Sequence, residues 1–363
     1  MNKITSQQFI FIIIAFTVVS LKTYPTIYIY NSGRDSWIAM IISSAIILIY
    51  FIFALKVFQK TNCYNLHYMY CNALGKILGN ILYTFFILSL FLTLVECAGV
   101  ESSAMHTNLL LESPIWYLLI FLIFPAIYCV KKGTRSILSL TIIGMILMTL
   151  AGINLFILTS TYKHYENLLP IFENGITSGF LISIIKILGL YGHITICFLY
   201  MEHIEKKDKL LKHSLIGFLF VIQMQIISVI GILATFQLER AVRFPYPKLL
   251  QTQLVSYWRF IESGEFFVML QTVGGWYIKY ILVLHLVIKC LTNINLKNKY
   301  LIYIISVLTF LITYCVAENL LVFLKFLNIY SYISFANFLI VPFMVITIFY
   351  FKNKNAAKSC QRS

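Results

Sequence analysis

The chain has 363 residues, of which 60% are hydrophobic and 11% are charged, and its mean hydropathy is +0.86. This composition excludes an ordinary soluble domain and indicates a membrane protein with many spans. The formal net charge is +15, but the basic residues are spread over many short loops. We therefore expect this positive charge to orient the chain in the lipid bilayer, and not to bind nucleic acid.

Ten apolar stretches have about the 20-residue length that a helix needs to cross a bilayer. The first five are expected near Gln8 to Tyr30, Trp37 to Phe58, Ile77 to Ser103, Pro114 to Val130 and Ile137 to Ser160. The second five are expected near Ile176 to Met201, Leu215 to Phe236, Phe267 to Lys289, Tyr300 to Val316 and Leu327 to Phe351. The sequence thus predicts one all-α integral membrane domain over residues 1–363, with one repeat near 8–160 and a second near 176–351.

The positions of Lys and Arg predict how the chain is oriented in the membrane. Every second connection is rich in them: Lys56, Lys60, Lys76, Lys131, Lys132, Arg135, Lys206, Lys207, Lys209, Lys212, Lys289, Lys297, Lys299, Lys352, Lys354, Lys358 and Arg362. The alternate connections carry Arg34, Lys163 and Lys325 singly, and one longer loop of mixed charge follows Phe236. Since basic loops stay in the cytoplasm, both termini are expected there.

The first and sixth stretches contain residues that interrupt a helix. Pro25 removes a backbone donor from the first stretch, and Gly189 and Gly192 lower the cost of leaving helical geometry in the sixth. Interruptions at matching places in two halves predict a 5+5 inverted repeat with broken helices 1 and 6 and a solute site near the bilayer midplane. The alternative is that Pro25 only kinks its helix and the glycines only permit close packing.

Four ionisable residues lie inside the apolar stretches: Lys22, Glu96, Lys186 and Lys279. Buried charge is costly in a membrane and marks functional sites. A rise of about 1.5 Å per residue places all four at similar depths, so we expect one shared cavity. Lys186 and Lys279 are predicted to be charge partners of the site or surrogates for a bound cation. The alternative is an ion pair between Glu96 and a lysine that only stabilises packing.

The residues expected to bind a ligand are Lys22, Thr23, Tyr24, Glu96, Gly189, Tyr191, Gly192 and His193. We expect no catalytic residue, metal or cofactor, because the sequence contains no phosphate-binding glycine loop, zinc pair or nucleophile elbow. His203 and Asp208 have the spacing of some acyltransferases, but they lie in a charged loop where such a spacing arises by chance.

The outer segment from Leu249 to Glu262 has apolar residues at helical spacing. It predicts an amphipathic helix at the outer surface. Three roles stay open for it: a lid over the site, a docking surface for a partner, or a loop that rests on lipid headgroups.

Several segments together resemble one family. They are Ile4-Thr5-Ser6-Gln7-Gln8, Gly33-Arg34-Asp35-Ser36-Trp37-Ile38, Phe244-Pro245-Tyr246-Pro247-Lys248-Leu249-Leu250-Gln251, Arg259-Phe260-Ile261-Glu262 and Trp276-Tyr277-Ile278-Lys279. The chain resembles the B subunits of bacterial spore germinant receptors, the GerAB/GerKB-like endospore germination permeases of the amino acid-polyamine-organocation superfamily. The resemblance implies a LeuT-like fold, the inner membrane of the spore, and assembly with an A subunit and a lipoprotein C subunit.

Two functions follow as hypotheses. The resemblance implies a spore germination protein: a permease-like receptor subunit, not an enzyme, that senses a nutrient germinant, most plausibly an amino acid. The alternative is a free-standing proton-coupled amino acid transporter. Uptake by vesicles that contain this chain alone would favour the transporter, and ligand binding without uptake would favour the sensor.

Overall fold

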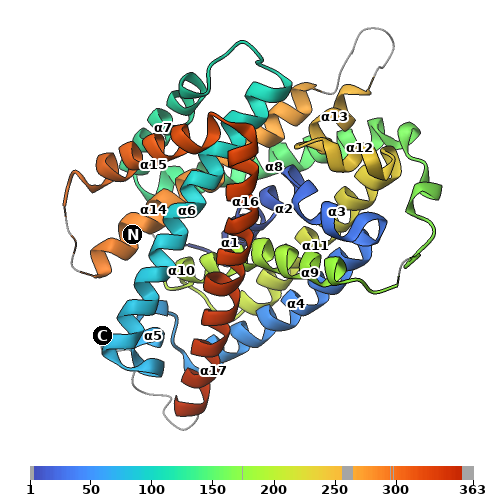
Figure 1. Cartoon of the computed structure of the whole chain (residues 1–363). Helices are drawn as coiled ribbons and strands as arrows, with labels where there is room; N and C mark the ends of the chain where they lie inside the picture. Colours follow the sequence, from blue (N-terminus) through green and yellow to red (C-terminus); the bar gives the residue numbers. More distant parts are fainter. Residues whose placement is uncertain (1–3, 174, 256–264, 295, 297, 354–363) are drawn as a thin grey trace.

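The computed structural model describes residues 4–173, 175–255, 265–294, 296 and 298–353 (Figure 1). Helices make up most of these residues. Eight helical segments among them are long and apolar enough to cross a bilayer. Two shorter apolar helices, Gln8–Thr17 and Leu301–Ala317, lie within the first and ninth predicted spans. The ten predicted apolar stretches are therefore all helical, which confirms an all-α membrane fold.

The helices follow the predicted stretches closely. The first half contains α1 (Gln8–Thr17), α2 (Val19–Thr23), α3 (Thr26–Ser32), η1 (Gly33–Asp35), α4 (Ser36–Thr61), α5 (Leu66–Leu74), α6 (Lys76–Asn108), α7 (Ile115–Lys132) and α8 (Thr134–Leu158). The short turns η2 (Ser160–Tyr162) and η3 (Tyr165–Leu168) lead to the second half. It contains α9 (Ser178–Tyr191), η4 (Gly192–Cys197), α10 (Phe198–Met201), α11 (Leu210–Thr235), α12 (Leu238–Arg243), α13 (Pro247–Gln253), α14 (Glu265–Asn293), α15 (Leu301–Ala317), α16 (Leu320–Ser334), the π-helical η5 (Phe335–Ile340) and α17 (Val341–Asn353).

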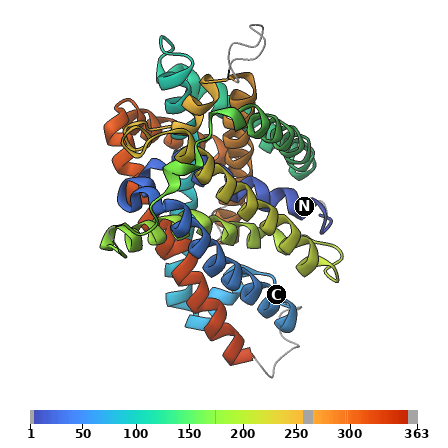
Figure 2. The ribbon, with the colours of Figure 1, turned by 90° about the vertical axis from the view of Figure 1, so that its right-hand side faces the viewer.

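Helices that are distant in sequence pack against one another. Helix α14 packs against α6 and α8, helix α9 packs against α3 and α4, and helix α1 packs against α11. The red rod of α16 and α17 runs through the front of Figure 1 beside α6, and in Figure 2 α17 runs alongside α4. Large apolar side chains such as Ile49, Phe124 and Phe351 point outward, because the solvent of this surface is lipid.

The basic connections meet at one end of the molecule, which we call the basic end. Ile4 N–H donates to the His203 carbonyl over 2.9 Å, and Lys352 Nζ donates to the Ala73 carbonyl over 2.8 Å. Lys207 lies 3.5 Å from the centre of the Tyr64 ring. Loops that the charge pattern assigned to one side of the membrane are therefore neighbours in space.

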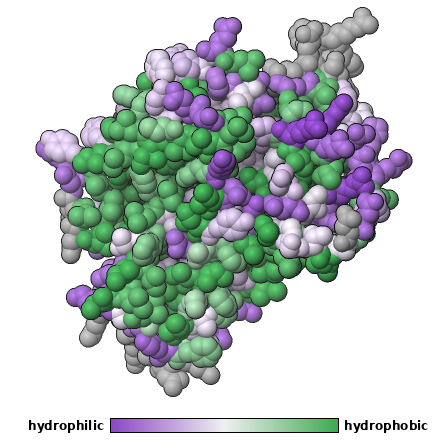
Figure 3. Space-filling view, viewed as in Figure 1, coloured by the Kyte–Doolittle hydropathy of each residue, from purple (hydrophilic) through white to green (hydrophobic). Residues whose placement is uncertain are grey.

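The alternate connections meet at the opposite end. The His164 N–H donates to the Ala234 carbonyl over 2.8 Å, and Thr26 Oγ1 donates to the Phe244 carbonyl over 2.7 Å. Arg34 pairs with Glu173 at 3.5 Å. Polar side chains gather on the right of Figure 3 around these connections, whereas apolar side chains cover the left and lower surface. The alternation read from the sequence thus matches two distinct ends.

The first span is broken at Pro25, and the structure supplies the hydrogen bond that proline cannot. In a continuous helix the Leu21 carbonyl would accept from the N–H of residue 25, which proline lacks. Tyr28 OH donates to this carbonyl over 2.9 Å instead. Tyr24 leaves helical geometry at φ −125° and ψ 60° and separates α2 from α3. The predicted break in the first span is confirmed.

A second irregularity precedes α2. Gln225 of α11 donates from Nε2 to the carbonyls of Thr17 and Val18, over 3.1 and 2.8 Å. These are the carbonyls at the junction of α1 and α2. An unpaired carbonyl is costly at membrane depth, because lipid offers no hydrogen-bond donor. The Gln225 side chain supplies that donor and so stabilises the junction of α1 and α2.

The sixth span changes its winding without leaving the helix. After Tyr191 the chain tightens to a 3₁₀ helix over Gly192–Cys197 and then returns to α geometry. A Cβ on Gly189 would lie 2.1 Å from the Ser331 carbonyl oxygen. Gly189 therefore permits close packing of α9 against α16, which is the alternative that the sequence left open for it.

The outer amphipathic segment lies only in part within the described residues. The described helix α13 ends at Gln253, and residues 256–264, which include the predicted apolar positions Trp258 and Ile261, lie outside the described residues. Gln251 is buried and donates to the Gly231 carbonyl over 2.9 Å. Helix α13 thus packs against α11 and α14.

Candidate ligand-binding site

A buried ion pair lies at the centre of the fold. Lys279 Nζ of α14 is 2.8 Å from Glu96 Oε2 of α6, and neither side chain is exposed. We call these two residues the central pair. The sequence predicted that Glu96 and Lys279 share a site, and the structure brings them into direct contact. Such a pair needs further hydrogen bonds, because its attraction alone seldom offsets the loss of water.

The neighbours of the central pair supply those hydrogen bonds. Lys279 Nζ also donates to Ser20 Oγ over 2.6 Å and lies 3.3 Å from His193 Nδ1, so all three ammonium protons have acceptors. Tyr24 OH donates to the other carboxylate oxygen of Glu96. The broken first span therefore contributes Ser20 and Tyr24, and the 3₁₀ segment of the sixth span contributes His193.

A chain of hydrogen bonds leads from the pair toward α16. Because Lys279 can only donate, His193 Nδ1 accepts and its Nε2–H faces Tyr330 OH at 2.8 Å. Tyr330 OH lies 2.8 Å from Thr93 Oγ1, which donates to the Ser89 carbonyl over 2.8 Å. Five spans thus meet in one polar network.

Aromatic rings cover the pair and keep it dry. Lys279 Nζ lies 5.0 Å from the centre of the Trp276 ring, a cation–π distance. Tyr24 stacks on Trp276 with ring centres 6.2 Å apart. Both rings are fully buried. In such surroundings a charged ligand that entered would interact strongly with the pair, because water does not screen the charges.

The other two lysines lie elsewhere, so the expectation that one cavity holds all four charges is wrong. Lys22 Nζ donates to Gln271 Oε1 over 2.5 Å on another side of α2. Lys186 Nζ donates to the Ile27 carbonyl over 3.0 Å and lies 5.8 Å from the centre of the Tyr332 ring. Lys186 thus donates a hydrogen bond to a backbone carbonyl of the first span and does not contact the central pair.

The remaining predicted residues pack near the site with other partners. Thr23 Oγ1 donates to the Val19 carbonyl over 2.8 Å, and Tyr191 OH lies 2.8 Å from Ser44 Oγ. A Cβ on Gly192 would lie 3.2 Å from Phe338 Cβ. The structure therefore places Glu96, Tyr24, His193 and Lys279 together, while these others face neighbouring helices.

Four residues of the network were not predicted: Ser20, Thr93, Trp276 and Tyr330. Trp276 lies three positions before Lys279 on the same helix, which was a usable signal because such positions share a face. Ser20 precedes Lys22 by two positions, and nothing in the sequence distinguishes it. Tyr330 is one of 24 tyrosines and gave no signal.

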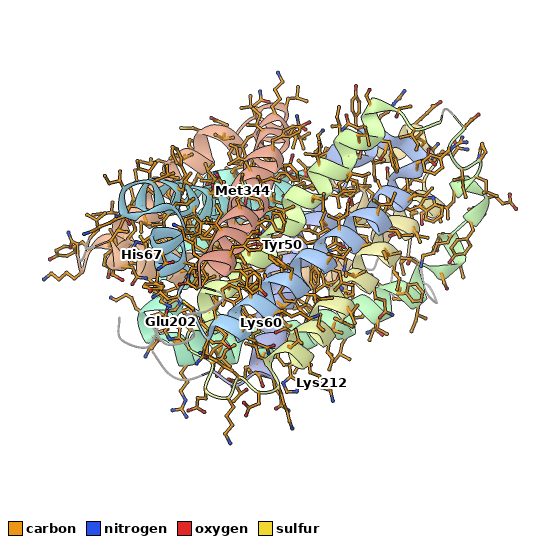
Figure 4. All side chains as sticks on the ribbon, turned by 90° about the horizontal axis from the view of Figure 1, so that it is seen from below. Tyr50, Lys60, His67, Glu202, Lys212 and Met344 are labelled. Atoms are coloured by element: carbon orange, nitrogen blue, oxygen red, sulfur yellow. The ribbon has the colours of Figure 1, made fainter. Side chains whose placement is uncertain are left out.

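The basic end carries a second cluster of charges. Lys289 Nζ lies 3.0 Å from Glu202 Oε2 and 2.5 Å from His203 Nε2. Figure 4, which views the molecule from below, labels Glu202. Burial, together with the nearby Lys289 ammonium, lowers the pKa of His203 to about 4. The ring is therefore neutral near pH 7 and accepts from Lys289. Asp208 is exposed, whereas His203 contacts Lys289 and Glu202.

No group of three or more His, Cys, Asp or Glu side chains that could hold a metal occurs in the part of the chain that the structure describes. The central network instead offers one ammonium, one carboxylate and several hydroxyls at a break between helices. These are groups that bind a small polar solute.

The fold is that of the LeuT-like class of membrane proteins. The structure superposes on MhsT in complex with L-phenylalanine with a TM-score of 0.71 at 15% identity, covering 96% of this chain and 90% of that one. It superposes on a manganese transporter of Eremococcus coleocola with a TM-score of 0.59 at 14% identity, covering 93% and 78%. At these identities the likeness establishes the fold alone.

Sequence comparison assigns the family. Residues 3–320 match the family described as "Spore germination protein", so the chain belongs to that family. It is also 27% identical over 259 residues to spore germination protein XB of Bacillus anthracis, which covers 71% of this chain and 72% of that protein. The resemblance seen in the short sequence segments is confirmed, and the chain is a germination-related, permease-like integral membrane protein.

Proposed function

We propose that the chain is the nutrient-sensing subunit of a spore germinant receptor and binds an amino acid at the central pair. The family, the transporter fold and the buried network support this proposal. The observation that carries it is the ion pair of Glu96 and Lys279 beside the broken first span. One carboxylate and one ammonium are the complement of the ammonium and carboxylate of an amino acid.

In this proposal the ligand exchanges with the pair. Its carboxylate binds Lys279 and Ser20, and its ammonium binds Glu96 and Tyr24, so each buried charge keeps an opposite partner. This matters because an unpaired buried charge costs about 3–5 kcal/mol. Because Glu96 and Lys279 contact each other in the structure, the ligand must separate them to bind.

Ligand binding can act as a signal if the helices make different contacts before and after the ligand separates Glu96 from Lys279. A ligand shifts an equilibrium only by its differential affinity for the states. The network joins the first, third, sixth, eighth and tenth spans, so opening the pair changes packing in all of them. We infer that this change passes to A and C receptor subunits in the inner membrane of the spore, with both termini of this chain in the cytoplasm.

The binding experiment uses the purified full chain in lipid nanodiscs and a panel of L-amino acids, measured by calorimetry. We expect at least one amino acid to bind, and Glu96→Gln to weaken it by about 10- to 100-fold, the value of a charge-assisted hydrogen bond of about 1.5–3 kcal/mol. Glu101→Gln is the matched control, because Glu101 is a second buried acid on α6. Equal weakening by both variants, or none by Glu96→Gln, contradicts the proposal.

The same preparation distinguishes sensor from transporter. MhsT, which shares the fold, was crystallised with L-phenylalanine, and a lysine in place of a bound cation suits proton coupling. Proteoliposomes with this chain alone should bind the amino acid without accumulating it. Uptake driven by a proton gradient would instead establish the transporter alternative.

A further inference from the structure

Two adjoining cavities open beside α2, away from the central pair. The larger has a volume of about 230 Å³ and the smaller about 40 Å³. Both are lined by Lys22, Thr149, Met224 and Lys248. Helices α2, α8, α11 and α13 therefore enclose a space that is large enough for a small solute with some water.

Three lysines line the larger cavity: Lys22, Lys163 and Lys248. We call it the lysine cavity. Neither Asp nor Glu is among the described residues that line it or the smaller cavity. Three ammonium groups around one half-buried space, without a carboxylate in the lining, create a positive potential that attracts anions.

The contacts of the three lysines are to neutral groups. Lys22 donates to the side-chain oxygen of Gln271, and Lys248 Nζ donates to Gln251 Oε1 over 2.6 Å. Lys163 Nζ lies 3.4 Å from the Phe156 carbonyl and 4.2 Å from the centre of its ring. These contacts orient the ammonium groups, and among the described residues none of the partners is a carboxylate.

An unsatisfied hydroxyl faces the same site. Ser228 lines the lysine cavity and is 5% exposed, and its Oγ has no hydrogen-bond partner among the described residues. A buried hydroxyl without a partner is uncommon and calls for a ligand or water. It would supply a neutral donor beside the three charged ones.

The direction of the pKa shift of Lys248 agrees with a cavity of positive potential. Burial, followed by the charges of Lys22 and Lys163, lowers the pKa of Lys248 well below its usual range. Burial also lowers the pKa of Lys163. An anion among the three groups would stabilise their charged forms.

We propose that the lysine cavity binds a small oxyanion, a carboxylate or phosphate group, on Lys22, Lys163, Lys248 and the Ser228 hydroxyl. The site is separate from the central pair. Lys163 and Lys248 belong to connections at the end opposite the basic end, so the anion arrives from that side. Since Lys22 and Ser20 share helix α2, an occupied lysine cavity acts on the helix whose Ser20 accepts a hydrogen bond from Lys279 of the central pair.

The experiment measures anion binding by calorimetry on the full chain in nanodiscs of zwitterionic lipid at constant ionic strength. The probes are sodium succinate and sodium phosphate, with chloride as the background anion. We expect at least one probe to bind the wild type and Lys163→Gln/Lys248→Gln to weaken it by about tenfold or more. Succinate alone identifies a carboxylate site, phosphate alone a phosphate site, and both a general oxyanion site.

The matched control is Lys131→Gln/Lys132→Gln, which removes two exposed lysines at the end of α7 and should leave the affinity unchanged. If the first double variant does not fold, the single variants Lys163→Gln and Lys248→Gln should each weaken binding by about threefold. No binding by the wild type, or equal affinity in wild type and cavity variants, overturns the proposal. Amino acid binding at the central pair is measured separately, so each proposal can fail alone.

Discussion

Lys279→Met should destabilise the protein by about 3–5 kcal/mol, because it leaves the Glu96 carboxylate buried without an ammonium partner. Methionine keeps the length of the side chain, so the loss reports charge and not volume. The measurement is the free energy of unfolding in mixed micelles. Lys279→Met/Glu96→Gln should recover much of the loss, since the second change removes the stranded charge.

Lys186→Met is the matched control for this experiment. It also removes a lysine from a span, but that lysine contacts a backbone carbonyl and an aromatic ring. We expect a change of about 1 kcal/mol, the value of one hydrogen bond. The account would be contradicted if Lys186→Met were as destabilising as Lys279→Met, or if the double variant were less stable than either parent.

Gly189→Ala should destabilise the contact between the sixth and tenth spans by about 1–3 kcal/mol. The added Cβ would lie 2.1 Å from the Ser331 carbonyl oxygen, and a backbone atom cannot rotate away. Alanine gains about 1 kcal/mol of helix propensity, but the clash outweighs it. Because His193 and Tyr330 join the same two spans, the affinity for the amino acid should also fall.

Gly274→Ala is the control for the added methyl group. Its Cβ would lie 3.7 Å from Met148 Sδ, an ordinary contact, so helix propensity should dominate and the protein should be unchanged or more stable. Thermal unfolding of both variants and ligand titration test the pair together. Gly189→Ala with wild-type stability would show that α9 and α16 are not in close contact.

The span pattern could be predicted because it depends on local properties of the sequence. Apolar length and the alternation of basic loops follow from the thickness of the bilayer and from membrane insertion. Pro25 predicted the first break because the loss of a backbone donor is local chemistry. The 3₁₀ winding after Gly192 was not predictable, since this segment contacts η5 and Tyr330 of α16, which are distant in sequence.

The grouping of the charges was predicted only in part, for a geometric reason. A rise per residue gives the depth of a side chain in the membrane but not the direction in which it points. Ser20 and Lys22 are two positions apart, about 200° around a helix. When Ser20 faces Lys279, Lys22 must therefore face away, and it lines the lysine cavity instead.

The central claim is tested most directly by a cryo-EM structure of the chain with its amino acid bound. In the structure, Lys279 Nζ lies 2.8 Å from Glu96 Oε2. We predict that this contact opens, with the ligand carboxylate on Lys279 and the ligand ammonium on Glu96. An intact contact between Glu96 and Lys279, with the amino acid bound elsewhere, would contradict the account.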